Sequence, residues 1–369
     1  MRARLFALVI KEFLAILRDA KSRMVLIGPP LIQLVIFGYA ASFDLNHVPF
    51  AVYDQDQSVA SRDLVADFAG SRAFQQVAVL HGPQHIKDLI DSRQVEMVLD
   101  IDPRFSRDLL TNQPAPVQVI VDGRNSNTAL VILGYANTII ADASARWAAS
   151  HGGAPPPAQL QTQALFNQNL DSHWFIIPGI VALLTQVVTL LVVGLSVARE
   201  REAGTFDQIL VTPLRPFDIL LGKSLPGLII GLAEGSVIIL AAHFWFRVPL
   251  LGGLVQLYTG LFLFTAAVTG IGLMISSLAA TQQQALLGAF LFMVPSIILS
   301  GFATPIANMP VLVQELTLLN PMRYALVVIR DCFLEQPGFC TLLPQYLAMT
   351  ALALFSLAAA GWLFRKRSV

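Results

Sequence analysis

Long apolar runs, each about as long as a membrane-spanning helix, dominate the sequence. A bilayer core about 30 Å thick requires about 20 consecutive apolar residues in a helix. Between residues 248 and 314 no charged residue occurs, and a polar turn at 281–284 divides this stretch into two runs. The pattern therefore predicts six transmembrane helices, at residues 24–43, 174–198, 219–246, 254–279, 285–304 and 345–364.

Residues 44–173 follow a different pattern, in which short runs with strand character alternate with helical stretches. This alternation is typical of an α/β domain. Ser58 and either Asn125 or Ser126 are the expected N-caps of two of its helices. The predicted strands cover 48–54, 74–80, 95–101 and 116–122, and the predicted helices cover 58–70, 83–94, 103–110 and 126–150.

Five aspartates stand at the ends of these predicted strands, where ligand sites of α/β sheets also form. Aspartate favours turns and helix caps for local reasons, because its short side chain accepts hydrogen bonds from nearby backbone N–H groups. We therefore favour a turn-forming role over a ligand site. The residues concerned are Asp54, Asp56, Asp100, Asp102 and Asp122.

The composition agrees with a membrane protein. Of the 369 residues 55% are hydrophobic and only 13% are charged, and the mean hydropathy is +0.64. Soluble domains carry about 25% charged residues. The net charge is zero, so no overall basic bias indicates a nucleic-acid partner. The expected fold is an α-helical polytopic membrane protein with an α/β extracytoplasmic domain inserted after the first span.

The positions of lysine and arginine set the expected orientation, because these residues are retained on the cytoplasmic side. They gather in residues 1–23, in the loop around 199–215 and in the tail after residue 364, which six spans place on one side. Both termini are thus expected in the cytoplasm of a bacterial cell with an inner membrane, and residues 44–173 in the periplasm. Residues 1–23 also show helical amphipathicity, which predicts an interfacial helix rather than a cleaved signal peptide.

The stretch VAREREAGTFDQILVTPLRP, residues 197–216, concentrates charge between two apolar runs. We interpret residues 199–202 as the solvated end of the second span. Gly204 would let the chain turn sharply there, because glycine adopts left-handed backbone angles without a steric cost. The charge would therefore mark the point at which the chain leaves the lipid.

A short helix is predicted directly after this turn, at residues 206–211. Thr205 and Gln208 have the spacing of a capping box at its start, and Pro213 ends it. The helix presents apolar residues to the cytoplasm, which favours contact with a protein partner. Contact with membrane lipid is the alternative.

The third predicted span carries two unusual features. Gly227, Gly231 and Gly235 recur every four residues, which would let another helix approach closely. Glu234 lies about midway along the same span, where a carboxylate is costly unless it is paired or hydrated. It could face the transport route, binding cationic substrates or changing protonation, or it could form a structural hydrogen bond to a neighbouring helix. The sequence does not favour either role.

Other chemical motifs are incomplete. Gly222-Lys223-Ser224 resembles the end of a phosphate-binding loop but lacks the earlier glycine, so we interpret Lys223 as a lysine that extends to the membrane surface. No catalytic constellation or metal-ligand pattern is found, and we expect neither. Cys332 and Cys340 are both expected outside, where a disulfide between them is chemically allowed, as are two free thiols.

Two further segments are informative: AREREAGTFDQILVTPLRPFDILLGK, residues 198–223, and LSGFATPIANMPVLVQELTLLNPMRY, residues 299–324. They resemble the permeases of ABC-2 type exporters, and specifically the multidrug-type subunits with a large extracytoplasmic domain. The resemblance implies a cytoplasmic coupling helix at 199–217 that contacts an ATPase, with residues 1–23 as an interface helix. The implied coupling residues are Glu200, Gly204, Thr205, Phe206, Asp207, Leu210 and Pro213. The implied re-entrant segment covers 305–344 and contains Pro305, Pro310, Pro321, Arg323 and Arg330.

The resemblance also implies partners and a function. The chain would be a transport subunit rather than an enzyme, exporting hydrophobic or amphipathic drug-like molecules. ATP and Mg²⁺ would bind a separate ABC ATPase subunit, and no cofactor would bind this chain. A second permease copy or a sister permease, a periplasmic adaptor protein and membrane lipid would be the other partners. An ion-coupled secondary transporter and a sensor of periplasmic ligands are the alternative functions.

Overall fold

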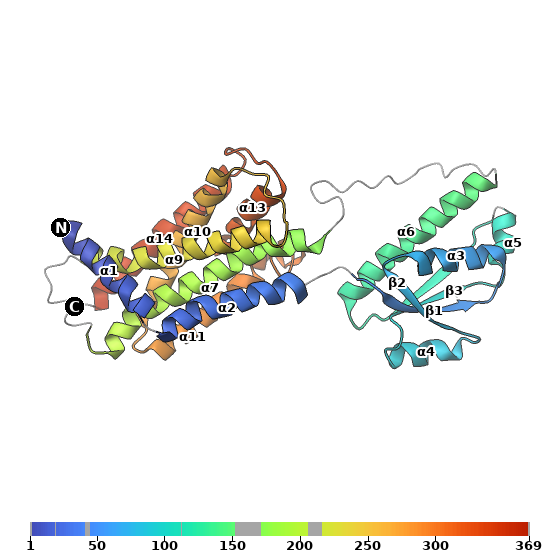
Figure 1. Ribbon diagram of the computed structural model, residues 1–369, viewed down its shortest axis with the longest axis horizontal. Helices are drawn as coiled ribbons and strands as arrows, with labels where there is room; N and C mark the ends of the chain where they lie inside the picture. Colours follow the sequence, from blue (N-terminus) through green and yellow to red (C-terminus); the bar gives the residue numbers. More distant parts are fainter. Residues whose placement is uncertain are drawn as a thin grey trace. The chain divides into compact units, whose positions relative to one another are not determined.

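The computed structural model describes residues 2–18, 20–40, 45–111, 113–151, 171–205 and 216–367. The chain divides into two compact units. One, here called the helical unit, comprises Met1–Ser42 and Ala164–Val369, and the other, the sheet unit, comprises Phe43–Gln163. Figure 1 shows the helical unit as a bundle and the sheet unit as a sheet covered by helices.

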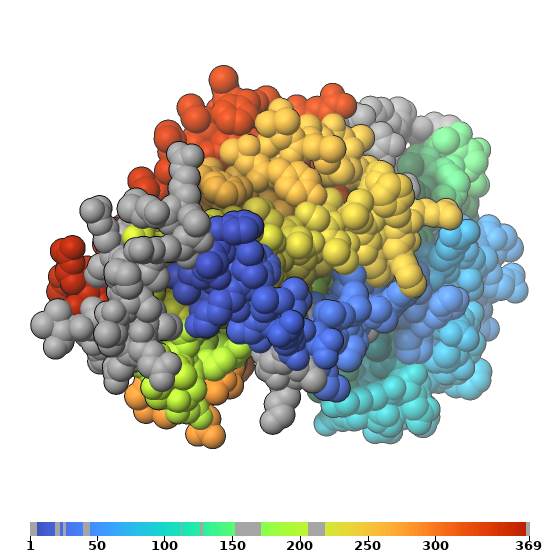
Figure 2. All heavy atoms as spheres, turned by 60° about the vertical axis from the view of Figure 1, so that its left-hand side comes forward, coloured from blue at the N-terminus to red at the C-terminus, as the bar shows by residue number. Residues whose placement is uncertain are grey.

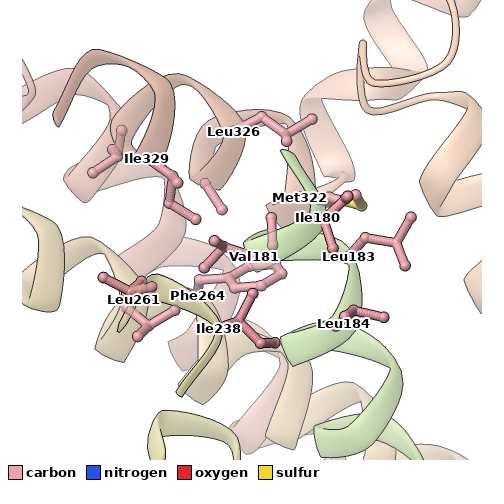
Figure 3. Close-up of a cluster of buried hydrophobic side chains, with 14 of the residues drawn as sticks. Ile180, Val181, Leu183, Leu184, Ile238, Leu261, Phe264, Met322, Leu326 and Ile329 are labelled. Atoms are coloured by element: carbon pink, nitrogen blue, oxygen red, sulfur yellow. The ribbon is translucent and has the colours of Figure 1, made fainter. Parts of the chain in front are cut away.

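Helix α7 is the centre of the helical unit. It packs against α2, α9, α10, α11 and α13, and α10 also pairs along its length with α14. A helix that is apolar on all sides, as α7 is, belongs inside a bundle. Figure 3 shows its residue Ile180 beside Met322 and its residue Val181 beside Phe264, in the main hydrophobic core to which Leu184 also belongs. The helices are α1 (Arg2–Arg18), α2 (Ala20–Ala40), α7 (Ser172–Glu202), α9 (Pro216–Phe244), α10 (Leu254–Leu278), α11 (Gln282–Ile298), α12 (Val311–Leu316), α13 (Pro321–Leu334) and α14 (Leu343–Arg367), with 3₁₀ turns η1 (Ile306–Asn308) and η2 (Thr317–Leu319).

Five helices among the described residues are long and apolar enough to cross a membrane. Four of them, α7, α9, α10 and α14, belong to the helical unit. The fifth, Thr128–Ser150, is part of α6 in the sheet unit, where its apolar residues pack on the sheet. Two shorter apolar helices, Ile27–Tyr39 within α2 and Gln282–Ile298, fall below that length. The chain is therefore a mostly helical, polytopic membrane protein.

The fifth predicted span is shorter than expected. We placed it at 285–304, whereas α11 begins at Gln282 and ends at Ile298. Gly301 follows with a φ of 86°, in the left-handed region, and the hydroxyl of Ser300 accepts a hydrogen bond from the Phe302 N–H. Apolar residues continue through this turn, so hydropathy alone could not locate the end of the helix.

The described residues of the sheet unit form a sheet of four strands in the order β2-β1-β3-β4. Strand β1 is parallel to both β2 and β3, and β4 is antiparallel to β3. Each predicted strand and helix of this unit overlaps an observed one. The elements are β1 (Val48–Asp54), α3 (Val59–Gly70), β2 (Phe74–Val79), α4 (Gln84–Asp91), β3 (Met97–Ile101), α5 (Phe105–Leu110), β4 (Val117–Val121) and α6 (Ser126–Ser150).

Alternating side chains of the central strands build a core on each face of this sheet. Phe50 and Leu99 face α3 and α6, whereas Ala51 and Val98 face α4. Successive side chains of a strand point to opposite faces of the sheet, so neighbouring residues contribute to different cores. Both predicted caps are present: Ser58 accepts from the Ser61 N–H, and Asn125, rather than Ser126, caps α6.

Three of the five aspartates at the strand ends, Asp54, Asp102 and Asp122, form turns as we expected, because each accepts a hydrogen bond from the backbone N–H two residues later. The other two bond to side chains distant in sequence, Asp56 to Ser106 and Asp100 to Gln55. Asp54 accepts hydrogen bonds from the Asp56 N–H at 3.0 Å and from the Ser61 hydroxyl at 2.7 Å. Asp122 accepts from the Arg124 N–H at 3.0 Å and pairs with its guanidinium. The hydrogen bonds from Arg124 lower the pKa of Asp122 to about 2.

Candidate functional site

The end of α7 is closed by a turn that glycine makes possible. Gly204 has a φ of 67°, its N–H donates to the Arg201 carbonyl, and the Thr205 N–H donates to the Glu200 carbonyl. These two bonds form a Schellman motif, which satisfies carbonyls that the helix end would otherwise leave unpaired. The sharp turn predicted at Gly204 is confirmed.

Glu200, Arg201 and Glu202, here called the charged triplet, immediately precede this turn. Successive residues of a helix point about 100° apart, so three neighbours can reach three different elements. Glu200 is buried, which corrects our interpretation of this residue as part of a solvated helix end, whereas Glu202 is exposed as we expected. It pairs with Lys223 of α9 at 2.5 Å and with Lys11 of α1.

The other two members of the charged triplet bind the connection between α10 and α11. Arg201 Nη1 donates to the carbonyls of Ser277, at 2.8 Å, and Ala279, at 3.2 Å, at the carboxyl end of α10. Glu202 accepts from the Gln282 N–H at 2.8 Å, at the amino end of α11. A positive charge is favoured at the carboxyl end of a helix and a negative charge at the amino end, so the helix dipoles of α10 and α11 favour Arg201 and Glu202, respectively. The triplet thereby joins the end of α7 to four other helices.

Four charges form a neutral cluster where α1, α7 and α9 meet, here called the ion cluster: Lys11, Glu12, Glu200 and Lys223. The side chain of Lys223 is only 1% exposed, and its Nζ also lies 3.2 Å from Glu12 Oε1. It does not extend to the surface as we predicted, because two buried carboxylates hold it inside. Burial acts to lower the pKa of Lys11, but its hydrogen bond to Glu200 and the charge of Glu12 outweigh this and raise it.

Helix α1 docks on α9 through two residues one turn apart. A Cβ built on Gly222 would lie 2.3 Å from Leu8 Cδ2, so a larger residue here would displace this side chain. Glu12, one turn later, reaches Lys223. The contact is visible in Figure 2, where the dark-blue surface of α1 lies against the yellow surface of α9. The Gly-Lys pair that resembled a phosphate loop is thus a docking site for α1.

The remaining predicted coupling residues cannot be placed. Phe206, Asp207, Leu210 and Pro213 lie outside the described residues, as does Gln208 of the predicted capping box. Thr205 is described, and its hydroxyl donates to the Glu200 carbonyl at 3.3 Å. The described structure therefore supplies the attachment of this segment to α7 but not the segment itself.

The glycine ridge of α9 packs directly on α7. A Cβ on Gly227 would lie 2.1 Å from Val193 Cγ2, and one on Gly231 would lie 2.1 Å from Thr189 Oγ1. A Cβ on Gly235 would lie 2.9 Å from Thr185 Oγ1. Because real Cβ atoms do not approach other atoms this closely, the ridge is required for the contact, which confirms its predicted role in close helix packing.

Glu234, next to this ridge in sequence, has a different environment. Neither carboxylate oxygen has a hydrogen-bond partner within the described part of the chain, and both oxygens are shielded from solvent. The structural hydrogen bond that we considered for this residue is therefore not formed there. A charged group near the centre of a membrane helix costs about 2.5–3.5 kcal/mol, so an unpartnered carboxylate is a candidate binding group.

The segment after α11 is anchored by a buried polar contact that the sequence analysis missed. Asn320 caps α13 by accepting from the Met322 N–H, and its amide donates to the Ser296 carbonyl of α11 at 2.7 Å. The Ser296 hydroxyl in turn lies 3.3 Å from Gln186 of α7. Asparagine before Pro321 is a strong start signal for a helix and could have indicated this cap.

The predicted residues of the re-entrant segment serve as helix starts and side-chain anchors. Pro305, Pro310 and Pro321 stand at the starts of η1, α12 and α13. Arg323 donates to the Gln314 carbonyl at 3.3 Å and to the Thr317 hydroxyl, which holds α12 and η2 against α13. Arg330 lies over the ring of Phe175 at 3.9 Å, near the start of α7.

The two cysteines are free thiols in the structure. Cys332 is buried in the core of the helical unit, and Cys340 is exposed beyond α13. Cys332 also contacts the connection between α9 and α10, because its carbonyl accepts from the Gly252 N–H at 2.8 Å. Of the two states that we considered, the structure has the free thiols.

Comparisons with known proteins converge on one family. The profile of the ABC-2 family transporter proteins matches residues 22–362. The probable multidrug ABC transporter permease YbhR of Escherichia coli is 38% identical over 334 residues, which cover 90% of each chain. The probable multidrug ABC transporter permease YbhS of the same organism is 31% identical, over 99% of this chain and 97% of its own. The inner membrane transport permease YhhJ, also from Escherichia coli, is 28% identical over 96% of this chain.

Proposed function

Because this chain belongs to the ABC-2 family of transporter proteins, as a transmembrane permease subunit of an ABC exporter, we propose that it receives mechanical work from a separate ATPase through residues 199–217. The observation that carries this proposal is the charged triplet at the end of α7. Its three side chains connect the proposed contact segment to α1, α9, α10 and α11. A force on this segment therefore acts on five helices together.

The transmission is rigid in this proposal. ATP and Mg²⁺ would bind the ATPase subunits, whose closure displaces residues 206–215. The Schellman turn at Gly204 passes this displacement to α7, and buried ion pairs resist separation because a carboxylate that loses its cation in a dry site is strongly destabilised. Helix α7 carries the movement to its other end, where Arg330 of α13 covers Phe175.

The proposed topology has six spans. Helix α2 has 21 residues and α11 has 17, and a helix of about 17–25 residues can cross the hydrocarbon core. They complete the set with α7, α9, α10 and α14. The end of α7, α1 and the end of α14 all lie at one end of the bundle, which supports placing both termini in the cytoplasm of a bacterial cell (Figure 1). The sheet unit, inserted between α2 and α7, would then be periplasmic.

The proposed assembly contains two permeases and an ABC ATPase. The second permease is either another copy of this chain or a sister chain, and a periplasmic adaptor would contact the sheet unit. The proposed cargo is a hydrophobic or amphipathic drug-like molecule, taken from the cytoplasm or the inner membrane. Two relatives are named as multidrug permeases, which supports this substrate class.

The test targets the segment that should contact the ATPase. Asp207→Lys and Phe206→Ala should each reduce ATP-driven uptake of amphipathic dyes into inverted membrane vesicles. Coupling contributions of about 0.5–2 kcal/mol correspond to a loss of about 2- to 30-fold. Asp91→Lys, an equal charge reversal on an exposed helix of the sheet unit, is the control. Full transport by both segment variants, at equal amounts in the membrane, would refute the proposed contact.

A further inference from the structure

A groove runs between α9 and the pair α1 and α2 on the outside of the helical unit. Its volume is about 360 Å³, within the range of small-molecule sites. Leu34, Ile230 and Ile238 form a buried floor. Leu17, Ile27, Leu31 and Val237 form the rim and are each about half exposed, so the groove opens to the side of the bundle rather than towards its core.

Glu234 is the only ionisable residue among the described residues that line this groove. Its two carboxylate oxygens have no hydrogen-bond partner in the described chain, and none of the ion pairs found there includes it. The glycine ridge on α9 already supplies the contact with α7, so Glu234 is not needed to pack these two helices. An apolar groove with one unpaired acid is complementary to a molecule that has an apolar body and one positive charge.

We propose that the α9 groove binds lipophilic monovalent cations, such as hydrophobic amines and quaternary phosphonium or ammonium ions, that enter from the lipid. The apolar body would occupy the floor formed by Leu34 and Ile238. The Glu234 carboxylate, whose oxygens are shielded from solvent in the structure, would turn into the groove to pair with the cationic centre. This inference names the substrate class of the permease and thus rests on the proposed function. Pairing in a dry site strengthens the attraction between the two charges, which selects cations over neutral or anionic molecules of the same shape.

A lipid chain is the competing occupant. It would fill the apolar floor equally well but would leave the acid of Glu234 without a counter-charge. Selectivity for charge therefore separates the two occupants. Tetraphenylphosphonium and tetraphenylborate suit this comparison, since they have nearly the same shape and opposite charge.

The experiment measures equilibrium binding of radiolabelled tetraphenylphosphonium to the purified full-length chain in lipid nanodiscs, without ATP or ATPase. The wild type should bind it saturably, and tetraphenylborate should not compete. Glu234→Gln should weaken binding at least about tenfold, as expected for loss of the attraction between two opposite charges at a site of low dielectric constant. Glu234→Asp should retain part of the affinity. Glu315→Gln, which removes an exposed carboxylate on α12, should bind like the wild type.

A second variant blocks the groove and keeps the acid. Ala233 lines the groove and is exposed, so Ala233→Trp should reduce binding while the thermal unfolding temperature of the protein stays unchanged. The assignment would be overturned if the wild type and Glu234→Gln bind tetraphenylphosphonium equally. It would also be overturned if the wild type binds tetraphenylborate as well as tetraphenylphosphonium, or shows no saturable binding. None of these results depends on the ATPase. The groove could therefore fail to bind cations although the chain exports other molecules with ATP, and it could bind cations although ATP-driven export is not observed.

Discussion

Glu200 and Glu234 are both acids with shielded carboxylates on long helices of the helical unit, but their surroundings differ. Glu200 lies at the end of α7 and has two lysine partners, with Lys223 at 2.5 Å. Glu234 lies within α9 and has no hydrogen-bond partner among the described residues. An acid whose cations come from neighbouring helices holds those helices together, whereas an acid without one retains the capacity to bind a charge from outside.

The two faces of α9 show the same contrast. Gly227 and Gly231 are in contact with α7 and leave no space for a larger side chain. Glu234 and Val237 line an open groove with α1 and α2. One helix therefore combines a tightly packed face with a face that can accept a ligand, and substitutions on the two faces should have opposite consequences.

The largest effect is expected from Lys223→Met. It would leave the buried Glu12 and Glu200 with Lys11, whose side chain is about half exposed, as the remaining cation of the ion cluster, which should lower the free energy of unfolding by up to about 3–5 kcal/mol. Thermal unfolding of the purified chain, followed by size-exclusion chromatography, measures this loss. Glu234→Gln is the matched control, because removing an unpaired acid should leave stability unchanged or raise it. A loss of stability from Glu234→Gln as large as that from Lys223→Met would remove the distinction between the two acids.

A smaller effect is expected from Gly231→Val on the packed face of α9. The new side chain would collide with Thr189, and overpacking of this kind costs about 1–3 kcal/mol. Gly28→Ala in α2 is the control, since a Cβ there meets no atom within 4 Å. Unfolding temperatures of both variants provide the comparison. If Gly231→Val unfolds at the wild-type temperature, the ridge is not a close contact.

The smallest effect concerns the cysteines and involves no change in stability. Cys340 is exposed and should react with a maleimide in the folded protein, whereas the buried Cys332 should react only after unfolding. Mass spectrometry of the labelled protein counts the modified thiols. A mass two units below that of the reduced chain, with no labelling before reduction, would show a disulfide instead.

Local patterns predicted much of the fold. The sheet unit was predicted element by element because each strand is short, has strand character throughout and is bounded by turn residues. Spans with charged ends were also located well, such as α7, which was predicted from 174 and begins at Ser172. The end of α11 was missed because the turn at Ser300 and Gly301 contains no charged residue and apolar residues continue directly after it.

The sites were harder to predict because their partners are distant in sequence. Glu200 and Lys11 are 189 residues apart, and Lys223 looked like an ordinary lysine near a membrane surface. Helical period places Leu8 and Glu12 on one face, but only the fold shows that this face meets Gly222 and Lys223. Glu234 was recognised from its position in a span, whereas its lack of a partner became visible only in three dimensions.

In the proposed mechanism, the charged triplet transmits work from the ATPase contact into the bundle. Arg201→Met breaks one of its connections, because it removes the donors to Ser277 and Ala279 and leaves the ion cluster intact. The measurement is the ratio of dye transported to ATP hydrolysed by the reconstituted complex, with Arg62→Met on the sheet unit as control. The Arg201→Met complex should assemble and hydrolyse ATP but transport about 2- to 30-fold less dye per ATP than the wild type. If its ratio equals that of the wild type, the charged triplet does not transmit the work of the ATPase.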